Sequence, residues 1–139
     1  MVDSVYTDDE TIDNETLLLR RVPSTPKLTI IWDSNLNTWR PSSAAFDNHP
    51  NGSPMSIVLS DTLDETERPY ESVLQGHEGF SLAAFKARIA RENNQGIARE
   101  PTTEEPAHGV VFGDKTKSVR KKLAKASNWI VEPDLPNVT

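Results

Sequence analysis

The chain has 139 residues, of which 35% are hydrophobic, and a formal net charge of −6 at pH 7. This length fits a single domain with a modest core, and no stretch approaches the roughly 18 apolar residues of a membrane-spanning helix. The lack of cysteine excludes disulfides, thiolate metal sites and a cysteine nucleophile. An acidic chain is also a poor general binder of nucleic acid, because phosphate contacts need local positive charge.

The first fourteen residues are polar and acidic, and no lysine or arginine precedes Arg20. Such a segment has little apolar surface to bury, so we expect residues 1–14 to form a disordered acidic tail. The opening MVDSVYTDDE contains neither the basic region nor the apolar run of a secretory signal. We therefore expect a cytoplasmic location.

Four segments in the first half are rich in apolar and β-branched residues and are expected to be extended: 15–22, 28–33, 38–46 and 55–60. In the third, Arg40 precedes a proline and so avoids the α region. The loop before the fourth contains an Asn51-Gly52 turn, so we expect the third and fourth segments to pair as a hairpin. The polar stretch 61–79 predicts one short helical turn.

Two helices are expected in the second half. Leu82, Phe85 and Ile89 have helical spacing, which predicts a helix over 82–93 that ends near Gly96. The stretch 107–113, AHGVVFG, predicts a strand. A second helix is predicted over 115–128, with Asp114 as its N-cap.

These elements predict an α+β fold, with a single small domain over residues 15–133. The expected sheet is mostly antiparallel and has about four to five strands, with the two helices in the C-terminal half. Residues 134–139 are expected to form a C-terminal tail.

The stretch HGVVFGDKTKS, residues 108–118, has the glycines, lysine and threonine of a phosphate-binding loop but not their spacing. A Walker A loop has four residues between its glycines and the lysine directly after the second one. Here three residues separate Gly109 from Gly113, and Asp114 separates Gly113 from Lys115. The intervening valines and phenylalanine favour a strand, so we expect no nucleotide cofactor at this place.

A basic stripe follows the predicted helix 115–128. Lys117, Lys121 and Lys125 recur every fourth residue, and Arg120 lies alongside. The stripe is either a solvated helix face or a surface that docks an acidic protein, a nucleic-acid backbone or the acidic N-terminus of the chain itself. No aromatic residue interleaves it, which disfavours base stacking. We expect another protein as the partner, with nucleic acid second and no membrane.

Catalytic candidates are few. The histidines lie in separate segments without zinc spacing, so we expect no metal site, and no G-x-S-x-G elbow marks a serine nucleophile. His108 opens a predicted strand and is a candidate base, while Arg40 and Ser42 have the groups to hold a phosphate or carboxylate. Arg20 lies on an early strand and completes a candidate pocket if the fold brings the four side chains together.

Two resemblances add to this interpretation. The order RPSSAAF…MSIVLS…PAHGVVFG…VRKKLAKASNWI resembles short hypothetical proteins of bacteria and phages. That resemblance implies such an origin and assigns no activity. An arginine on an early strand (Arg20 or Arg21) and the serines Ser42 and Ser43 on a later segment resemble the loose pattern of ADP-ribosyl-transfer folds, but no catalytic glutamate can be named here.

Two hypotheses of different class follow. The first is a non-catalytic intracellular interaction protein, a small accessory, regulatory or immunity-type domain that binds another macromolecule through Lys117, Arg120, Lys121 and Lys125. The alternative is a small nucleotide-binding or ADP-ribosyl-transfer-like enzyme with an Arg/Ser/His pocket. The positions of Arg20, Arg40, Ser42 and His108 in the fold separate the two.

Overall fold

The computed structural model describes residues 6–138 of the chain. Its strands are β1 (Leu17–Pro23), β2 (Ile30–Asp33), β3 (Thr38–Pro41), β4 (Met55–Leu59), β5 (Phe80–Lys86), β6 (Gly96–Arg99), β7 (His108–Phe112) and β8 (Asn128–Val131). Its α-helices are α1 (Ser60–Glu65), α2 (Ala87–Glu92) and α3 (Lys117–Ala126), and its 3-10 helices are η1 (Ser43–Phe46) and η2 (Tyr70–Leu74).

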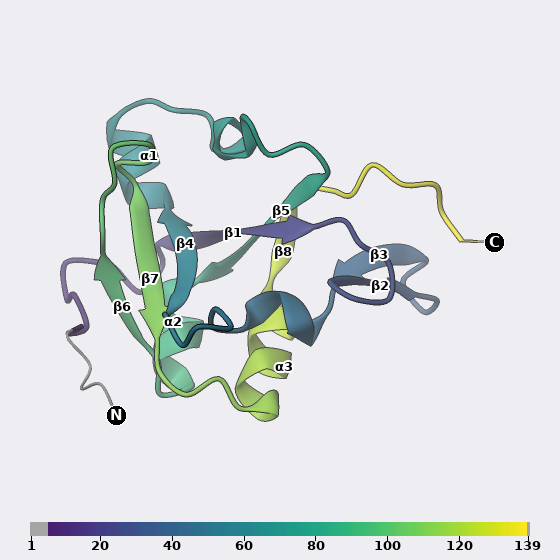
Figure 1. Cartoon of the computed structure of the whole chain (residues 1–139), viewed down its shortest axis with the longest axis horizontal. Helices are drawn as coiled ribbons and strands as arrows, with labels where there is room; N and C mark the ends of the chain where they lie inside the picture. The colour runs from purple at the N-terminus through teal and green to yellow at the C-terminus, as the bar shows by residue number, and fades with distance from the viewer. Residues whose placement is uncertain (1–5, 139) are drawn as a thin grey trace.

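Six strands form one sheet in the order β6-β7-β4-β1-β5-β8, and β2 with β3 form a separate hairpin at one end of the molecule (Figure 1). Every strand pairing in the sheet is antiparallel. The predicted α+β class and the single small domain are confirmed. The predicted strand number was too low, because β5, β6 and β8 were not recognised as strands.

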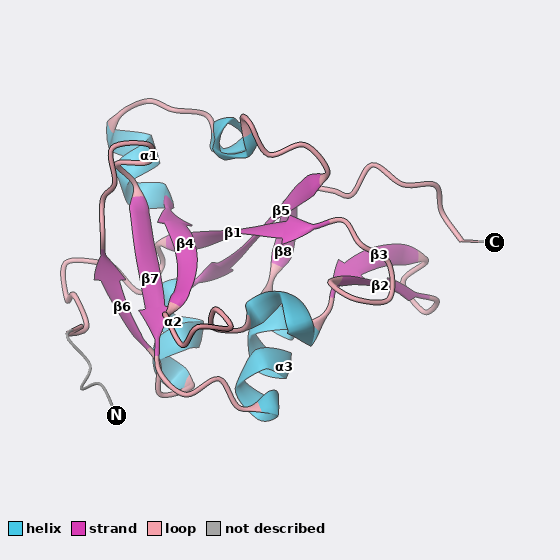
Figure 2. Cartoon of the chain, viewed as in Figure 1, coloured by secondary structure: helices cyan, strands magenta, loops and turns pink. Residues whose placement is uncertain are grey.

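Helices cover both faces of the six-stranded sheet (Figure 2). On one face, α2, α3 and η1 enclose a core that contains Phe46, Phe85 and Leu123. On the other face, α1 and η2 bring Leu63 and Val73 against the central strands. Within residues 6–138, no helix is long and apolar enough to cross a bilayer.

Residues 80–86 form β5, so the helix predicted over 82–93 is wrong in its first half. Ser81 to Phe85 are all buried, because β5 is central and packed on both faces. A strand buried on both faces lacks the polar–apolar alternation that identifies strands in a sequence. α2 begins only at Ala87, and Gly96, the expected terminator, opens β6.

The hairpin predicted between residues 38–46 and 55–60 does not form. Instead, β3 pairs with β2, and β4 lies between β1 and β7. A four-residue turn joins β2 to β3, and the Asp33 carboxylate closes it by accepting the backbone N–H of Asn35 at 2.9 Å. Four of the five residues of β4 are apolar and buried, with at least one on each face, so β4 takes a central position in the larger sheet.

The N-terminal segment packs against the domain, so the disordered tail predicted for residues 1–14 is absent at 6–14. Ile12 is fully buried in the core. Arg91 donates to the carbonyl oxygens of Ile12 at 2.8 Å and Asp9 at 2.9 Å. Composition did not predict this packing, because the segment is held by one buried isoleucine and by hydrogen bonds from a distant arginine. Residues 1–5 of that predicted tail lie outside the described residues.

The C-terminal segment also makes contacts beyond the predicted domain limit of residue 133. Leu135 packs against the core cluster, and the carbonyl oxygen of Pro136 accepts the indole N–H of Trp39 at 3.2 Å. Two residues of the segment predicted as a tail over 134–139 are therefore attached to the domain, Leu135 at the core and Pro136 at the β2–β3 hairpin.

Candidate functional site

The β2–β3 hairpin forms one wall of a surface groove. Its strands are in register from Ile30↔Pro41 to Asp33↔Thr38. The Asp33 carboxylate also accepts the backbone N–H of Leu36 at 3.1 Å, which fixes Leu36 in the turn with 70% of its surface exposed. Leu28, before β2, is 61% exposed. Single exposed leucines are ordinary, but these two line the same hollow.

Helix α3 forms the opposite wall. Thr116 is its N-cap, because the Thr116 hydroxyl accepts the backbone N–H of Val119 at 3.2 Å. Leu123 and Ala124 are buried on the core side. This anchoring leaves Lys121 and Lys125 exposed on the side of the helix that faces the hairpin.

The groove between these walls has a volume of about 810 Å³. Leu28, Ile31 and Leu36 are prominent in its apolar lining. Its charged lining consists of four cations and one carboxylate, namely Lys27, Arg40, Lys121, Lys125 and Asp33. The exposed Arg40 and the partly buried Asp33 form an ion pair with 3.3 Å between Nε and Oδ2. The only carboxylate in the lining is therefore already paired, and the groove is cationic within an acidic chain.

The predicted basic stripe is only partly a groove feature. Lys121 and Lys125 line the groove, and Lys117 is exposed on the same helix outside it. Arg120 is partly buried and donates from Nε to the carbonyl oxygen of Lys115 at 3.2 Å. Two of the four predicted binding residues are therefore positioned to meet a ligand in this hollow.

The start of α3 differs from the prediction. The helix begins at Lys117 after Thr116, and Lys115 is buried before it instead of forming its first turn. The Lys115 ammonium donates to the carbonyl oxygens of Val111 at 2.9 Å and Gly113 at 3.2 Å. Burial lowers the pKa of Lys115 to about 8. This lysine is bonded to the backbone of its own strand and turn, so it is not free to reach a phosphate.

The four catalytic candidates divide between two places. Arg40 and Ser42 line the groove, while Arg20 and His108 line a separate cavity of about 40 Å³ beside β1 and β4. The enzyme hypothesis requires the four side chains to share one pocket, and the structure does not bring them together.

Arg20 and Ser42 are both bonded to backbone carbonyl oxygens. Arg20 donates to the carbonyl oxygens of Ala45 at 3.0 Å and Ser56 at 2.8 Å, and burial lowers its pKa to about 10. Ser42 is buried, and its hydroxyl donates to the carbonyl oxygen of Leu28 at 2.6 Å. Arg20 therefore fixes η1 against β4, and Ser42 fixes the base of the hairpin.

His108 belongs to a polar cluster on the other face of the sheet. Its Nδ1 lies 2.8 Å from the carbonyl oxygen of Glu100, and the Glu100 carboxylate accepts the hydroxyl of Tyr6 at 2.5 Å. Over residues 6–138, no three His, Asp or Glu side chains are grouped to hold a metal ion. The cluster joins the N-terminal segment to β7.

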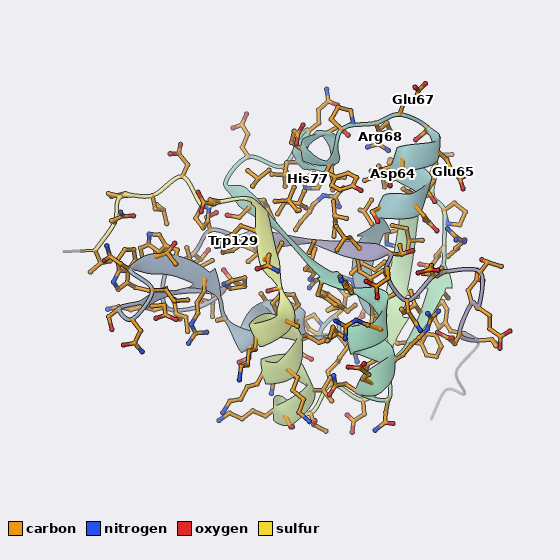
Figure 3. The ribbon with its side chains drawn as sticks, turned by 180° about the vertical axis from the view of Figure 1, so that it is seen from behind. Asp64, Glu65, Glu67, Arg68, His77 and Trp129 are labelled. Carbon is orange, nitrogen blue, oxygen red and sulfur yellow. The ribbon has the colours of Figure 1, made fainter. Side chains whose placement is uncertain are left out.

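A second buried charge cluster was missed by the sequence analysis. The carboxylate of Glu105 accepts hydrogen bonds from both terminal nitrogens of Arg68, at 2.5 and 3.0 Å. Nη2 of Arg21 lies 4.0 Å from Oε1 of the same carboxylate. Burial alone would raise the pKa of Glu105, but the hydrogen bonds from Arg68 and the Ala107 amide outweigh it and lower that pKa. Figure 3 shows Arg68 after α1, near the labelled acids of that segment. The cluster ties the segment after α1 to the loop before β7.

The apolar lining of the groove was also missed. Leu36 lies in the polar turn SNLN, and Leu28 follows the loop PSTPK. An isolated leucine in a polar turn is the only sequence signal for such a site, and it does not show which surface lies opposite.

Comparison of the chain with protein-family models, with curated proteins and with solved structures found no match. The candidate site therefore rests on the residues and geometry of this chain alone.

Proposed function

We propose that this protein is a non-catalytic interaction protein, an accessory, regulatory or immunity-type domain, that binds an acidic segment of another protein in the groove between β2–β3 and α3. The observation that carries this proposal is the cationic lining of the groove around exposed leucines. In a chain of net charge −6, this local excess of cations is complementary to an acidic ligand.

An acidic protein segment fits the groove better than nucleic acid. No aromatic side chain belongs to the groove lining, so bases have no surface on which to stack. The aliphatic lining instead suits the apolar side chains of a peptide. The remainder of the chain is acidic and repels a polyanion more strongly than it repels a short peptide.

Charge reversal inside and outside the groove tests the proposal. The probe is a fluorescein-labelled peptide of eight residues with alternating glutamate and valine. We expect Lys121→Glu with Lys125→Glu to weaken its binding at least about tenfold, or roughly 1.4 kcal/mol, because two attractions become repulsions. Added salt should weaken binding to the unchanged protein, since exposed charges are screened over about 8 Å.

The matched control is Lys117→Glu with Lys122→Glu. Both residues are exposed on α3 outside the groove lining, and the change in net charge is the same. We expect this control to bind within about threefold of the unchanged protein. Equal losses in the two variants would show that only overall charge matters. Tighter binding of a single-stranded oligonucleotide than of the peptide would favour nucleic acid instead.

A further inference from the structure

The groove adjoins one edge of the six-stranded sheet. Its lining includes Ser127 and Asn128, where α3 ends and β8 begins. β8 is the last strand of the sheet and pairs only with β5. Within residues 6–138, no backbone hydrogen bond joins the outer side of β8 to another segment. An uncovered edge presents N–H and C=O groups that can pair with another extended chain.

The opposite edge shows how this fold covers a strand. The backbone N–H of Asp9 donates to the carbonyl oxygen of Ile97 on β6 at 2.8 Å. The N–H of Ile97 donates in turn to the carboxylate of Asp8 at 2.9 Å. Arg91 and Arg99 are paired with these acids at 3.3 and 3.4 Å. An acidic segment of the chain, held by neighbouring cations, therefore lies along the β6 edge.

The β8 edge also has cations beside it, since Lys121 and Lys125 lie in the groove where β8 begins. Among residues 6–138, however, no acidic segment pairs with the backbone of this edge. We propose that the acidic partner segment binds as an added strand along β8, with its acidic side chains over these cations. This inference rests on the function proposed above and specifies an extended, acidic peptide as the ligand.

The dimensions of β8 limit the added strand. Four residues at about 3.3 Å each give an edge of roughly 13 Å, so a partner stretch of four to six residues is sufficient. The register of β8 with β5 shifts between Trp129 and Val131, as at a β-bulge. A bulge turns the edge away from regular pairing, so we expect the pairing to centre on Asn128 and Trp129, beside the groove. Figure 3 shows Trp129 on β8.

Backbone N-methylation of the peptide tests strand addition without altering the protein. Alternate residues of an extended strand direct their N–H groups to opposite edges. Two versions of the alternating glutamate–valine peptide are therefore made, one N-methylated at every glutamate and one at every valine. If the peptide adds to β8, we expect one version to lose binding at least tenfold and the other to stay within about threefold of the parent. Hydrogen exchange of the β8 amides should also slow when the parent peptide is bound, whereas the β6 amides should not change.

The outcomes separate this inference from the function on which it rests. If the parent peptide binds through Lys121 and Lys125 but both methylated versions bind like it, strand addition is wrong and the groove function stands. Equal loss of binding in both methylated versions also overturns strand addition. In that case, the two edges of the bound peptide contribute equally, whereas an added strand would pair with β8 through only one of them. If the parent peptide does not bind, or binds equally to the Lys121→Glu, Lys125→Glu variant, the groove function itself fails.

Discussion

The two edges of the six-stranded sheet differ in how their charges and backbone groups are satisfied. At β6, Asp8 and Asp9 bond to the backbone of Ile97, and their carboxylates are paired with Arg91 and Arg99. At β8, the edge adjoins a groove whose two lysines from α3 are exposed. The edges lie at opposite ends of the sheet order, and Figure 1 shows the N-terminal segment beside β6 and the hairpin beyond the β8 side.

This difference shows that charge composition alone does not identify a binding surface. The N-terminal end of the sequence has a dense cluster of acids and no lysine or arginine before Arg20. Two of these acids, Asp8 and Asp9, nevertheless form ion pairs within the domain. The cationic groove is assembled from two segments more than 80 residues apart, Lys27 to Arg40 and Lys121 to Lys125. The surface that we assign to binding is the one with two exposed lysines, Lys121 and Lys125, beside exposed leucines.

The largest expected effect tests whether the β6 side is part of the core. Ile12→Ala should lower the free energy of unfolding by about 2–5 kcal/mol, because it empties a fully buried site. Thermal or urea unfolding measures this change, and the melting temperature should fall by roughly 10 °C. The control is Leu36→Ala on the groove side, whose exposed side chain should cost less than about 0.5 kcal/mol. A melting temperature of Ile12→Ala within about 2 °C of the unchanged protein would show that the segment does not pack.

The next effect concerns Lys115, a cation just before α3 that is buried, unlike the exposed lysines of the groove. Burial lowers the pKa of Lys115 to about 8 in the folded state, whereas the ordinary pKa of a lysine is 10.5. The unfolded chain therefore binds more protons than the folded chain between these two pH values. The contribution of Lys115 to stability should therefore rise with pH across this window and be constant below it. Asp47 and Asp114 oppose the shift and Arg20 supports it.

Lys115→Met isolates this contribution. Between pH 7 and pH 9.5, the stability of the unchanged protein relative to Lys115→Met should increase by on the order of 2 kcal/mol. Urea unfolding of both proteins at the two pH values measures the difference. A constant or decreasing difference would mean that the Lys115 ammonium is not destabilised by its burial.

The smallest expected effect tests the cover of the β6 edge. Asp8→Ala removes the acceptor of the Ile97 N–H and a partner of Arg91, which should cost about 1 kcal/mol. Hydrogen exchange of the Ile97 amide should become roughly fivefold faster, because that free energy protects it. Glu10→Ala, which removes an exposed acid from the same segment, should leave the exchange unchanged. If both variants exchange alike, Asp8 is not a specific cover of the edge.

Much of the fold could be predicted wherever local signals and packing agree. The strands β1, β4 and β7 were found because their apolar runs are bounded by turns or polar residues. Helix α3 was found because one face carries its apolar residues. β5 was assigned to a helix, because a strand buried on both faces lacks the alternation of polar and apolar residues that identifies strands. The N-cap of α3 was misplaced by two residues, since Asp114 and Thr116 are both good caps and only the burial of Lys115 distinguishes them.

By itself, the sequence determined the α+β class, the single domain, the strand–turn–helix at residues 108–118 and the exposed lysines of α3. These features depend on composition and on contacts between near neighbours, which a local pattern contains. Only the tertiary structure decided which cations meet in a groove, that Arg20 and Ser42 bond to backbone carbonyls, and that one sheet edge is covered while the other is open. Those outcomes depend on contacts between residues far apart in the chain, such as Arg91 with the N-terminal segment and Trp129 with Trp39. No local pattern specifies which distant segments will meet.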